Sequence, residues 1–122
     1  MLLWIGLGGA VGSILRYLVG ALVQRPAHAG FPVGTLVVNV VGCFIIGVLT
    51  QHFMNVQTQP MMRAALITGF CGGFTTFSAF SIETVGLLRG GEYGSAATYL
   101  VLSVTFSILA TVFGMAAAKA VA

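Results

Sequence analysis

The sequence predicts an all-α membrane protein, a single domain over residues 1–122 that crosses the lipid bilayer as four helices. Hydrophobic residues make up 58% of the chain and charged residues only 6%, whereas an average soluble domain carries roughly 25% charged residues. So few charges cannot cover a water-soluble globule, and the high hydrophobicity excludes a disordered tail. The five basic residues are dispersed, so no nucleic-acid-binding patch is expected.

Four apolar stretches account for the predicted transmembrane helices. They cover residues 2–23, 31–54, 64–88 and 93–118, and each reaches the ~20 residues that a helix needs to cross a ~30 Å hydrocarbon core. Continuous apolar runs of this length favour helices, because the strands of a membrane barrel alternate in polarity over about ten residues. The connectors between the spans are short.

The first span combines small residues with one charge. Gly8 and Gly12 lie four residues apart, hence on one helix face, and predict close packing against another helix. Arg16 either raises the anion concentration at the entrance of a pathway, or snorkels to the interface or pairs with a carboxylate. The sequence leaves both alternatives open.

Polar residues follow one face of the second span and one face of the fourth. Thr35 and Asn39 are four residues apart, and Tyr99, Ser103 and Ser107 repeat that spacing over more than two turns. A single Ser or Thr in a membrane helix often bonds to its own backbone or to a neighbouring helix. Aligned tracks in so short a chain are harder to explain in that way, and they predict a polar pathway.

The third span contains an unusual run from Gly69 to Ser81, in which paired glycines precede Thr75 and Thr76. These residue types are poor helix formers, so we expect the third helix to be broken near its middle. Carbonyl groups freed by a break can hold a cation when protein or a cavity surrounds them. The alternative is an unbroken helix that uses its glycines for close packing.

Aromatic and acidic residues continue this run. Phe77 and Phe80 normally serve packing, but the positive edge of a phenyl ring can also face an anion. Glu83 is the only acidic residue within a span. We expect it to pair with a backbone group or a basic residue, because a carboxylate is unfavourable beside an anion pathway.

The distribution of basic residues gives no orientation signal. Arg63 and Lys119 would lie on one side of the membrane with the N-terminus, and Arg25 and Arg89 on the other. The positive-inside rule therefore does not choose between the two orientations. This balance predicts insertion both ways and an antiparallel, dual-topology homodimer.

Three motifs resemble the Fluc (CrcB) family of fluoride channels. They are GGAVGSILRY at 8–17, GTLVVNVVG at 34–42 and GFCGGFTTFSAFS at 69–81, the last followed by Glu83. The resemblance covers nearly the whole chain and implies a passive channel that exports cytoplasmic fluoride ion and relieves its toxicity. It also implies a multi-pass protein of the bacterial cell inner (plasma) membrane, whose antiparallel homodimer has two pores and one structural Na⁺ at its centre.

The resemblance assigns roles to single residues as well. The main-chain carbonyls of Gly72 and Thr75 from both subunits would hold the sodium ion, and Arg16 would lie near a pore vestibule. The fluoride pore would be formed by the ring edges of Phe77 and Phe80 and by the polar side chains of Asn39, Thr35, Ser78, Tyr99, Ser103 and Ser107. Ala79 stands where family members often carry Thr, which leaves the role of that position open.

Two other classes of protein stay open. A small dual-topology multidrug or cation exporter has a similar length, but proton-coupled antiport needs a carboxylate in the first span, where this chain has Arg16. A non-transporting accessory subunit would explain the glycines but not the aligned polar tracks. An enzyme is not expected, because the chain offers no Ser/His/Asp arrangement and no cluster of metal ligands.

Overall fold

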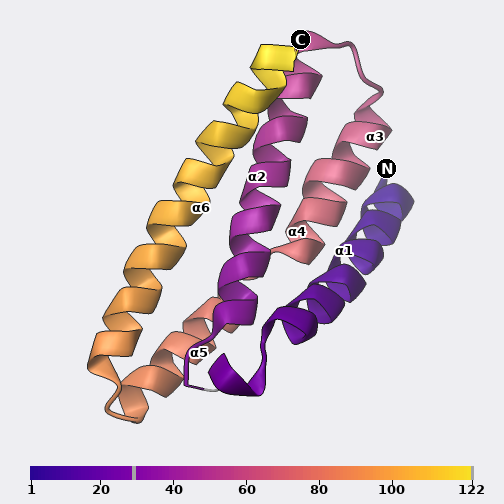
Figure 1. Cartoon of the computed structure of the whole chain (residues 1–122). Coiled ribbons are helices and arrows are strands. Elements are labelled where there is room, and N and C mark those ends of the chain that lie inside the picture. Colours follow the sequence, from indigo (N-terminus) through magenta and orange to yellow (C-terminus); the bar gives the residue numbers. More distant parts are fainter. Residues whose placement is uncertain (29, 122) are drawn as a thin grey trace.

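The computed structural model describes residues 1–28 and 30–121 and is helical (Figure 1). Its elements are α1 (Leu2–Val23), the 3-10 turn η1 (Pro26–His28), α2 (Val33–Asn55), α3 (Pro60–Arg63), the π-helical η2 (Ala64–Cys71), α4 (Gly72–Phe74), α5 (Phe77–Arg89) and α6 (Tyr93–Val121). Within these described residues, four helical segments are long and apolar enough to cross a membrane, the third of them running from Pro60 to Arg89. The prediction of four long apolar helices is therefore confirmed. The third begins at Pro60 because proline suits the first turn of a helix.

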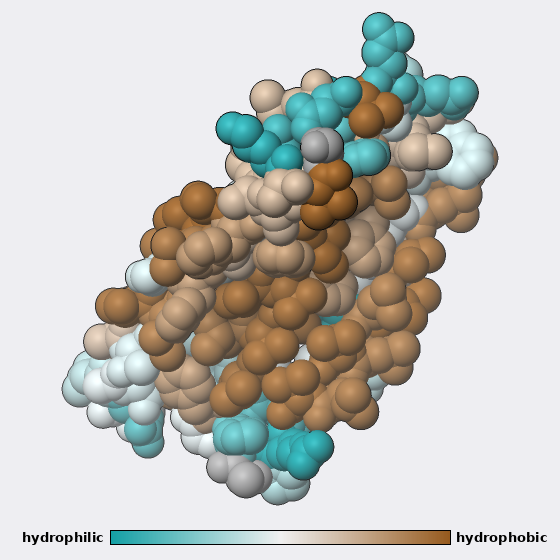
Figure 2. Space-filling view, turned by 45° about the horizontal axis from the view of Figure 1, so that its top comes forward, coloured by the Kyte–Doolittle hydropathy of each residue, from teal (hydrophilic) through white to brown (hydrophobic). Residues whose placement is uncertain are grey.

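The surface of the molecule has an apolar middle and polar ends. On the face drawn in Figure 2, hydrophobic side chains cover the broad centre and hydrophilic ones gather at the two extremities. Large hydrophobic side chains are exposed on α1, such as Leu7 and Ile14, and on α6, such as Val104 and Ile108. This is the distribution of a chain that is solvated by lipid around its middle.

The helices form two pairs. α2 packs along α6, while α1 packs against η2 and α4 (Figure 1). The predicted close packing of the first span is confirmed, because a Cβ atom at Gly12 would overlap the carbonyl oxygen of Phe70, and one at Gly8 that of Ala65. Gly47 of α2 and Gly114 of α6 allow an equally close approach in the other pair.

The third span changes partners along its length. Its first part, η2 and α4, lies against α1, whereas α5 lies against α6. Two residues with extended backbone connect these parts: Thr75 has φ −82° and ψ 157°, and Thr76 has φ −149° and ψ 112°. This two-residue connection carries the chain from one helix pair to the other, behind α2 in Figure 1.

Candidate functional site

Asn39 of α2 binds the extended connection through both ends of its carboxamide. Its Nδ2 donates to the carbonyl oxygen of Thr76 at 3.0 Å, and its Oδ1 accepts from the Thr76 N–H at 2.7 Å. Backbone polar groups are costly inside a membrane unless they are paired. The side chain that the sequence places on a polar pathway therefore also pairs with the main chain of the third span.

The hydroxyl of Thr76 caps α5. Its Oγ1 accepts from the Ala79 N–H at 3.1 Å and lies 3.3 Å from the hydroxyl of Ser78. Threonine is a preferred residue at this position, because its side chain satisfies an N–H that has no partner within the helix. Thr76, which the sequence identifies only as a poor helix former, is thus the cap of α5.

The two predicted cation ligands, Gly72 and Thr75, both precede this cap in the chain. In an unbroken α-helix, the N–H groups of Thr76 and Ala79 would bond to the carbonyls of Gly72 and Thr75, four residues earlier. Here the first N–H is donated to Asn39 and the second to the Thr76 hydroxyl. Gly72 also faces open space, since nothing lies within 4 Å of the position that a Cβ would take.

Glu83 of α5 joins three helices. Its Oε1 accepts from the hydroxyl of Thr35 on α2 at 2.7 Å, and its Oε2 accepts from the hydroxyl of Tyr99 on α6 at 2.6 Å. The expected partner, a backbone group or a basic residue, was therefore wrong. The reason is geometric: the ring of Tyr99 packs against Phe80 at 5.2 Å and edge-on against Phe31 at 5.6 Å between centroids, which directs its hydroxyl at the carboxylate.

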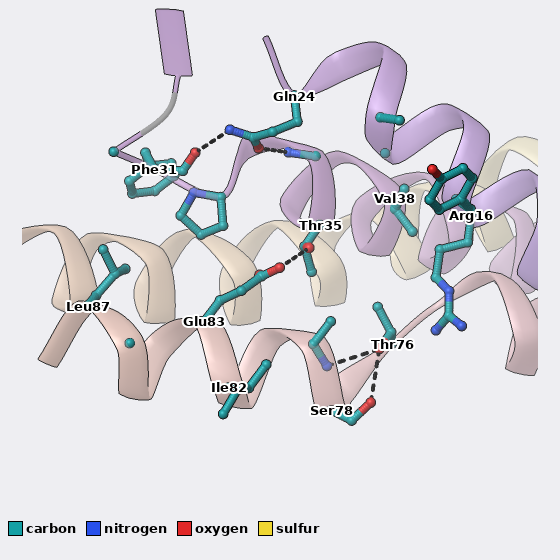
Figure 3. A pocket seen from close by; sticks show the side chains of 18 of the residues that line it. Arg16, Gln24, Phe31, Thr35, Val38, Thr76, Ser78, Ile82, Glu83 and Leu87 are labelled. Atoms are coloured by element: carbon teal, nitrogen blue, oxygen red, sulfur yellow. Dashed lines mark hydrogen bonds between the residues drawn. The ribbon is translucent and has the colours of Figure 1, made fainter. Parts of the chain in front are cut away.

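A cavity of about 1080 Å³ lies beside this cluster. Of the predicted site residues, Arg16, Thr35 and Ser78 line it, together with Thr76 and Glu83. Figure 3 shows the Arg16 side chain extending from α1 beside the segment that carries Thr76 and Ser78. Arg16 thus lines the same cavity as the carboxylate of Glu83.

A groove of about 340 Å³ lies on the other side of the extended connection. It gathers the remaining predicted fluoride-pore residues except Tyr99, namely Asn39, Phe77, Phe80, Ser103 and Ser107, together with Thr75, one of the two predicted cation ligands. Thr76 lines this groove and also the larger cavity. The two hollows therefore meet at the residue that Asn39 binds.

The aromatic residues of the groove differ in exposure. The side chain of Phe77 is 79% exposed, whereas Phe80 is buried, and their ring centroids are 5.5 Å apart. Tyr99 is fully buried and lines neither hollow. The predicted pore residues are thus divided between a cavity, a groove and one buried hydroxyl cluster.

Ser103 is the one buried hydroxyl that lacks a partner among the described residues. Its Oγ is inaccessible to solvent and makes no hydrogen bond there, although the residue lines the groove. A buried hydroxyl without a partner is unfavourable. A ligand that accepts a hydrogen bond, lying in the groove, would satisfy it.

Gln24 is a residue that the sequence analysis missed. Its Nε2 donates to the carbonyl of His28 at 2.8 Å. It also donates to the carbonyl of Phe31 at 3.0 Å, and its Oε1 accepts from the Gly34 N–H at 2.9 Å (Figure 3). These bonds hold the first connector against the start of α2, beside the cavity. A polar side chain at the end of an apolar span was the available signal.

The four apolar helices and the two hollows that share Thr76 define a multi-pass α-helical membrane protein with polar side chains gathered along its third span. Comparison with known proteins then gives the family. Residues 3–115 match the family described as CrcB-like protein, Camphor Resistance (CrcB), and the chain belongs to this family.

Several relatives share nearly the full length of the chain. A protein of Rhizobium meliloti (strain 1021) is 48% identical over 120 residues, which is 98% of this chain and 96% of the relative. One of Sulfurovum sp. (strain NBC37-1) is 50% identical over 115 residues, 94% and 90% of the two chains, and one of Chlorobium phaeobacteroides (strain BS1) is 48% identical over 119 residues, 97% and 92%. Each is named fluoride-specific ion channel FluC, the name of a channel and not of an enzyme.

Proposed function

We propose that this protein is a passive, fluoride-selective ion channel. The observation that carries the proposal is the meeting of the cavity and the groove at Thr76, where uncharged hydrogen-bond donors line both hollows. The names of the relatives support the same function. Arg16, in the wall of the cavity, raises the local anion concentration at the entrance.

The chemistry of the passage suits a small, strongly hydrated anion. Such an ion leaves water only if hydrogen-bond donors replace its hydration shell, and the hydroxyls of Ser78, Ser103 and Ser107 can donate. A fixed positive charge in the narrow part would hold the ion too firmly, since conduction requires moderate binding at several positions. In the groove, where Asn39, Ser103 and Ser107 line the wall, the polar side chains are uncharged.

The groove of one chain also suggests how the channel assembles. Phe77 projects from the groove and is 79% exposed, so a second copy packed against this face would cover it. The balanced basic residues favour a copy inserted in the opposite orientation, hence an antiparallel homodimer. In this dimer the ring edges of Phe77 and Phe80 border the fluoride path.

A structural sodium ion fits the same arrangement. The carbonyls of Gly72 and Thr75 lack the N–H donors of a continuous helix, and carbonyls of unwound membrane helices are suitable ligands for Na⁺. One chain supplies two such carbonyls, so two chains together supply four. A bound sodium ion provides a fixed positive charge that joins the two copies.

The physiological role follows from the direction of the fluoride gradient. Fluoride enters a cell as neutral HF, dissociates in the cytoplasm and leaves through a passive channel, which relieves its toxicity. The site of action is the bacterial inner (plasma) membrane. The relatives named above come from bacteria, which supports this location.

Substitution of the groove phenylalanines tests the pore. Phe77→Ile and Phe80→Ile keep an apolar side chain but remove the ring edge, so we expect each to slow fluoride efflux from liposomes roughly tenfold, equivalent to about 1.4 kcal/mol in the barrier. A fluoride electrode measures the efflux, and size-exclusion chromatography checks that the variants still assemble.

Phe106→Ile is the matched control, because Phe106 lies on α6 outside both hollows and is 49% exposed. It should retain wild-type efflux. Wild-type efflux through both groove variants would refute the role of the ring edges.

A further inference from the structure

The carboxamide of Asn39 binds an N–H group that a main-chain carbonyl would bind in a continuous helix. In a continuous third helix, the Thr76 N–H would bond to the Gly72 carbonyl. Instead, the Oδ1 of Asn39 accepts this N–H at 2.7 Å, and its Nδ2 holds the Thr76 carbonyl at 3.0 Å. The side chain of α2 thus competes directly with a main-chain acceptor of the third span.

Space for this competition comes from the same face of α2. Gly42 lies one helical turn beyond Asn39, and a Cβ at Gly42 would overlap Cγ2 of Thr75 and lie 3.0 Å from a ring carbon of Phe74. The absence of a side chain at Gly42 therefore lets the extended connection approach within hydrogen-bonding distance of Asn39. Asn39 and Gly42 of α2 therefore both determine where the extended connection lies.

The second carbonyl is freed in the same manner. The Ala79 N–H would bond to the Thr75 carbonyl in a continuous helix, but it is donated to the Thr76 hydroxyl at 3.1 Å. Asn39 fixes the backbone of Thr76, which in turn places its hydroxyl as the cap of α5. One side chain of α2 and one of the connection therefore determine the state of both carbonyls.

We propose that Asn39 is a positioning residue for the cation site: by accepting the Thr76 N–H, it keeps the Gly72 carbonyl free of a helical hydrogen bond and available to sodium. This role is separate from donating a hydrogen bond to an anion in the groove. The inference rests on the proposed sodium site and assigns the residue that forms it. Thr76 performs the same function for the Thr75 carbonyl.

Two substitutions at position 39 separate these roles. Asn39→Asp retains a carboxyl oxygen that accepts the Thr76 N–H, whereas Asn39→Leu removes the acceptor and lets this N–H return to Gly72. If Asn39 served only to donate a hydrogen bond to an anion, both variants would be stabilised by sodium as the wild type is. If Asn39 positions the cation site, Asn39→Asp should preserve the response to sodium and Asn39→Leu should weaken it.

The experiment measures stabilisation by sodium rather than transport. Detergent-solubilised protein is titrated with NaCl against N-methyl-D-glucamine chloride at constant chloride, and the midpoint of thermal unfolding is followed by circular dichroism at each sodium concentration. A ligand that binds the folded state raises this midpoint. For Asn39→Leu we expect the half-maximal sodium concentration to rise about tenfold, because a carbonyl engaged in a helical hydrogen bond must break it to bind the ion.

The pair Thr76→Val and Thr76→Ser keeps the test decisive if Asn39→Leu does not fold. Val removes the hydroxyl that caps α5 and should weaken the sodium response in the same direction, whereas Ser retains the hydroxyl and should follow the wild type. Sodium curves of Asn39→Leu, or in its place Thr76→Val, that coincide with the wild type would overturn the inference.

Failure of the proposed sodium site has a different result. In that case the wild-type protein itself shows no sodium-dependent shift, and both the site and the positioning role are refuted. Fluoride efflux from liposomes made with the same preparation then shows separately whether the channel function stands.

Discussion

At the residue scale, the hydroxyl groups of the spans differ in what they bind, and two kinds account for many of them. Most serve their own helix: Thr84, Thr98 and Thr111 each donate to the carbonyl four residues earlier. Those of Thr35 and Tyr99 instead cross to another helix and meet at Glu83. These two crossing hydrogen bonds join α2 and α6 to α5 through one side chain, in addition to the packing between the helices.

Ser103 belongs to neither kind, and we expect its substitution to have opposite effects on stability and transport. Its buried hydroxyl lacks a partner among the described residues, and such a group costs about 1–3 kcal/mol. Ser103→Ala should therefore raise the free energy of unfolding by about 1 kcal/mol while slowing fluoride efflux. Thermal unfolding and liposome efflux measure the two effects.

Thr105→Ala provides the comparison for Ser103→Ala, since Thr105 is exposed on α6 and lines neither hollow. Thr105→Ala should neither raise the free energy of unfolding nor slow fluoride efflux. A Ser103→Ala protein that is less stable than the wild type and transports normally would contradict the assignment of this hydroxyl to the path.

The sequence could predict which residues are polar but not what each one contacts. The four-residue spacing of Tyr99, Ser103 and Ser107 puts them on one face of a helix. It does not say that Tyr99 is fully buried while Ser103 and Ser107 reach a groove. That distinction depends on how α5 and α6 approach each other, and on the aromatic contacts that direct the Tyr99 hydroxyl at Glu83.

At the element scale, the third span is the segment on which the others converge. Its first part packs on α1 and its last part on α6, and Asn39 of α2 binds the backbone of Thr76 between them. The residue types of this run already favour an irregular helix. They do not predict how far the helix is interrupted or that Asn39 binds the interruption. Asn39 lies 37 positions before Thr76 in the chain, so this contact depends on the tertiary structure.

Gly42→Ala should destabilise the third span more than the addition of a single methyl group suggests. The added methyl group would overlap Thr75, and overpacking of this kind typically costs about 1–3 kcal/mol. We therefore expect a lower thermal unfolding midpoint and reduced fluoride efflux. Both follow from displacement of the extended connection away from Asn39.

Gly6→Ala is the control for Gly42→Ala, because nothing lies within 4 Å of a Cβ at Gly6 in α1. Replacing a glycine within a helix by alanine should there raise the stability by roughly 0.5 kcal/mol. Equal unfolding midpoints for the two variants would show that the close contact at Gly42 does not matter.

At the scale of the whole molecule, the arrangement of charge and hydrophobicity governs how the chain inserts. The apolar middle and polar ends of Figure 2 require a membrane, and the basic residues on its two sides balance. Composition alone was sufficient to predict four spans, since each apolar run exceeds the length that a bilayer demands. Composition could not predict that α2 pairs with α6 and α1 with η2, which depends on the close contacts of individual glycines.

The proposed dual topology leads to an expected result in cells. A tag at the C-terminus should be accessible from both sides of the membrane in comparable amounts, because no loop carries a decisive excess of basic residues. Replacing the exposed Gln57 and Gln59 by arginine in the connector between α2 and α3 should bias all copies to one orientation. A wild-type tag found on one side only would exclude the antiparallel dimer.

The most direct test of the channel is efflux from liposomes that contain the purified protein and are loaded with the potassium salts of both fluoride and chloride, with valinomycin to carry the compensating charge, no ATP and no proton gradient. We expect rapid loss of fluoride down its gradient while chloride is retained. Liposomes that hold their fluoride, or that release an organic cation only when a proton gradient is imposed, would contradict the proposed function and favour the exporter.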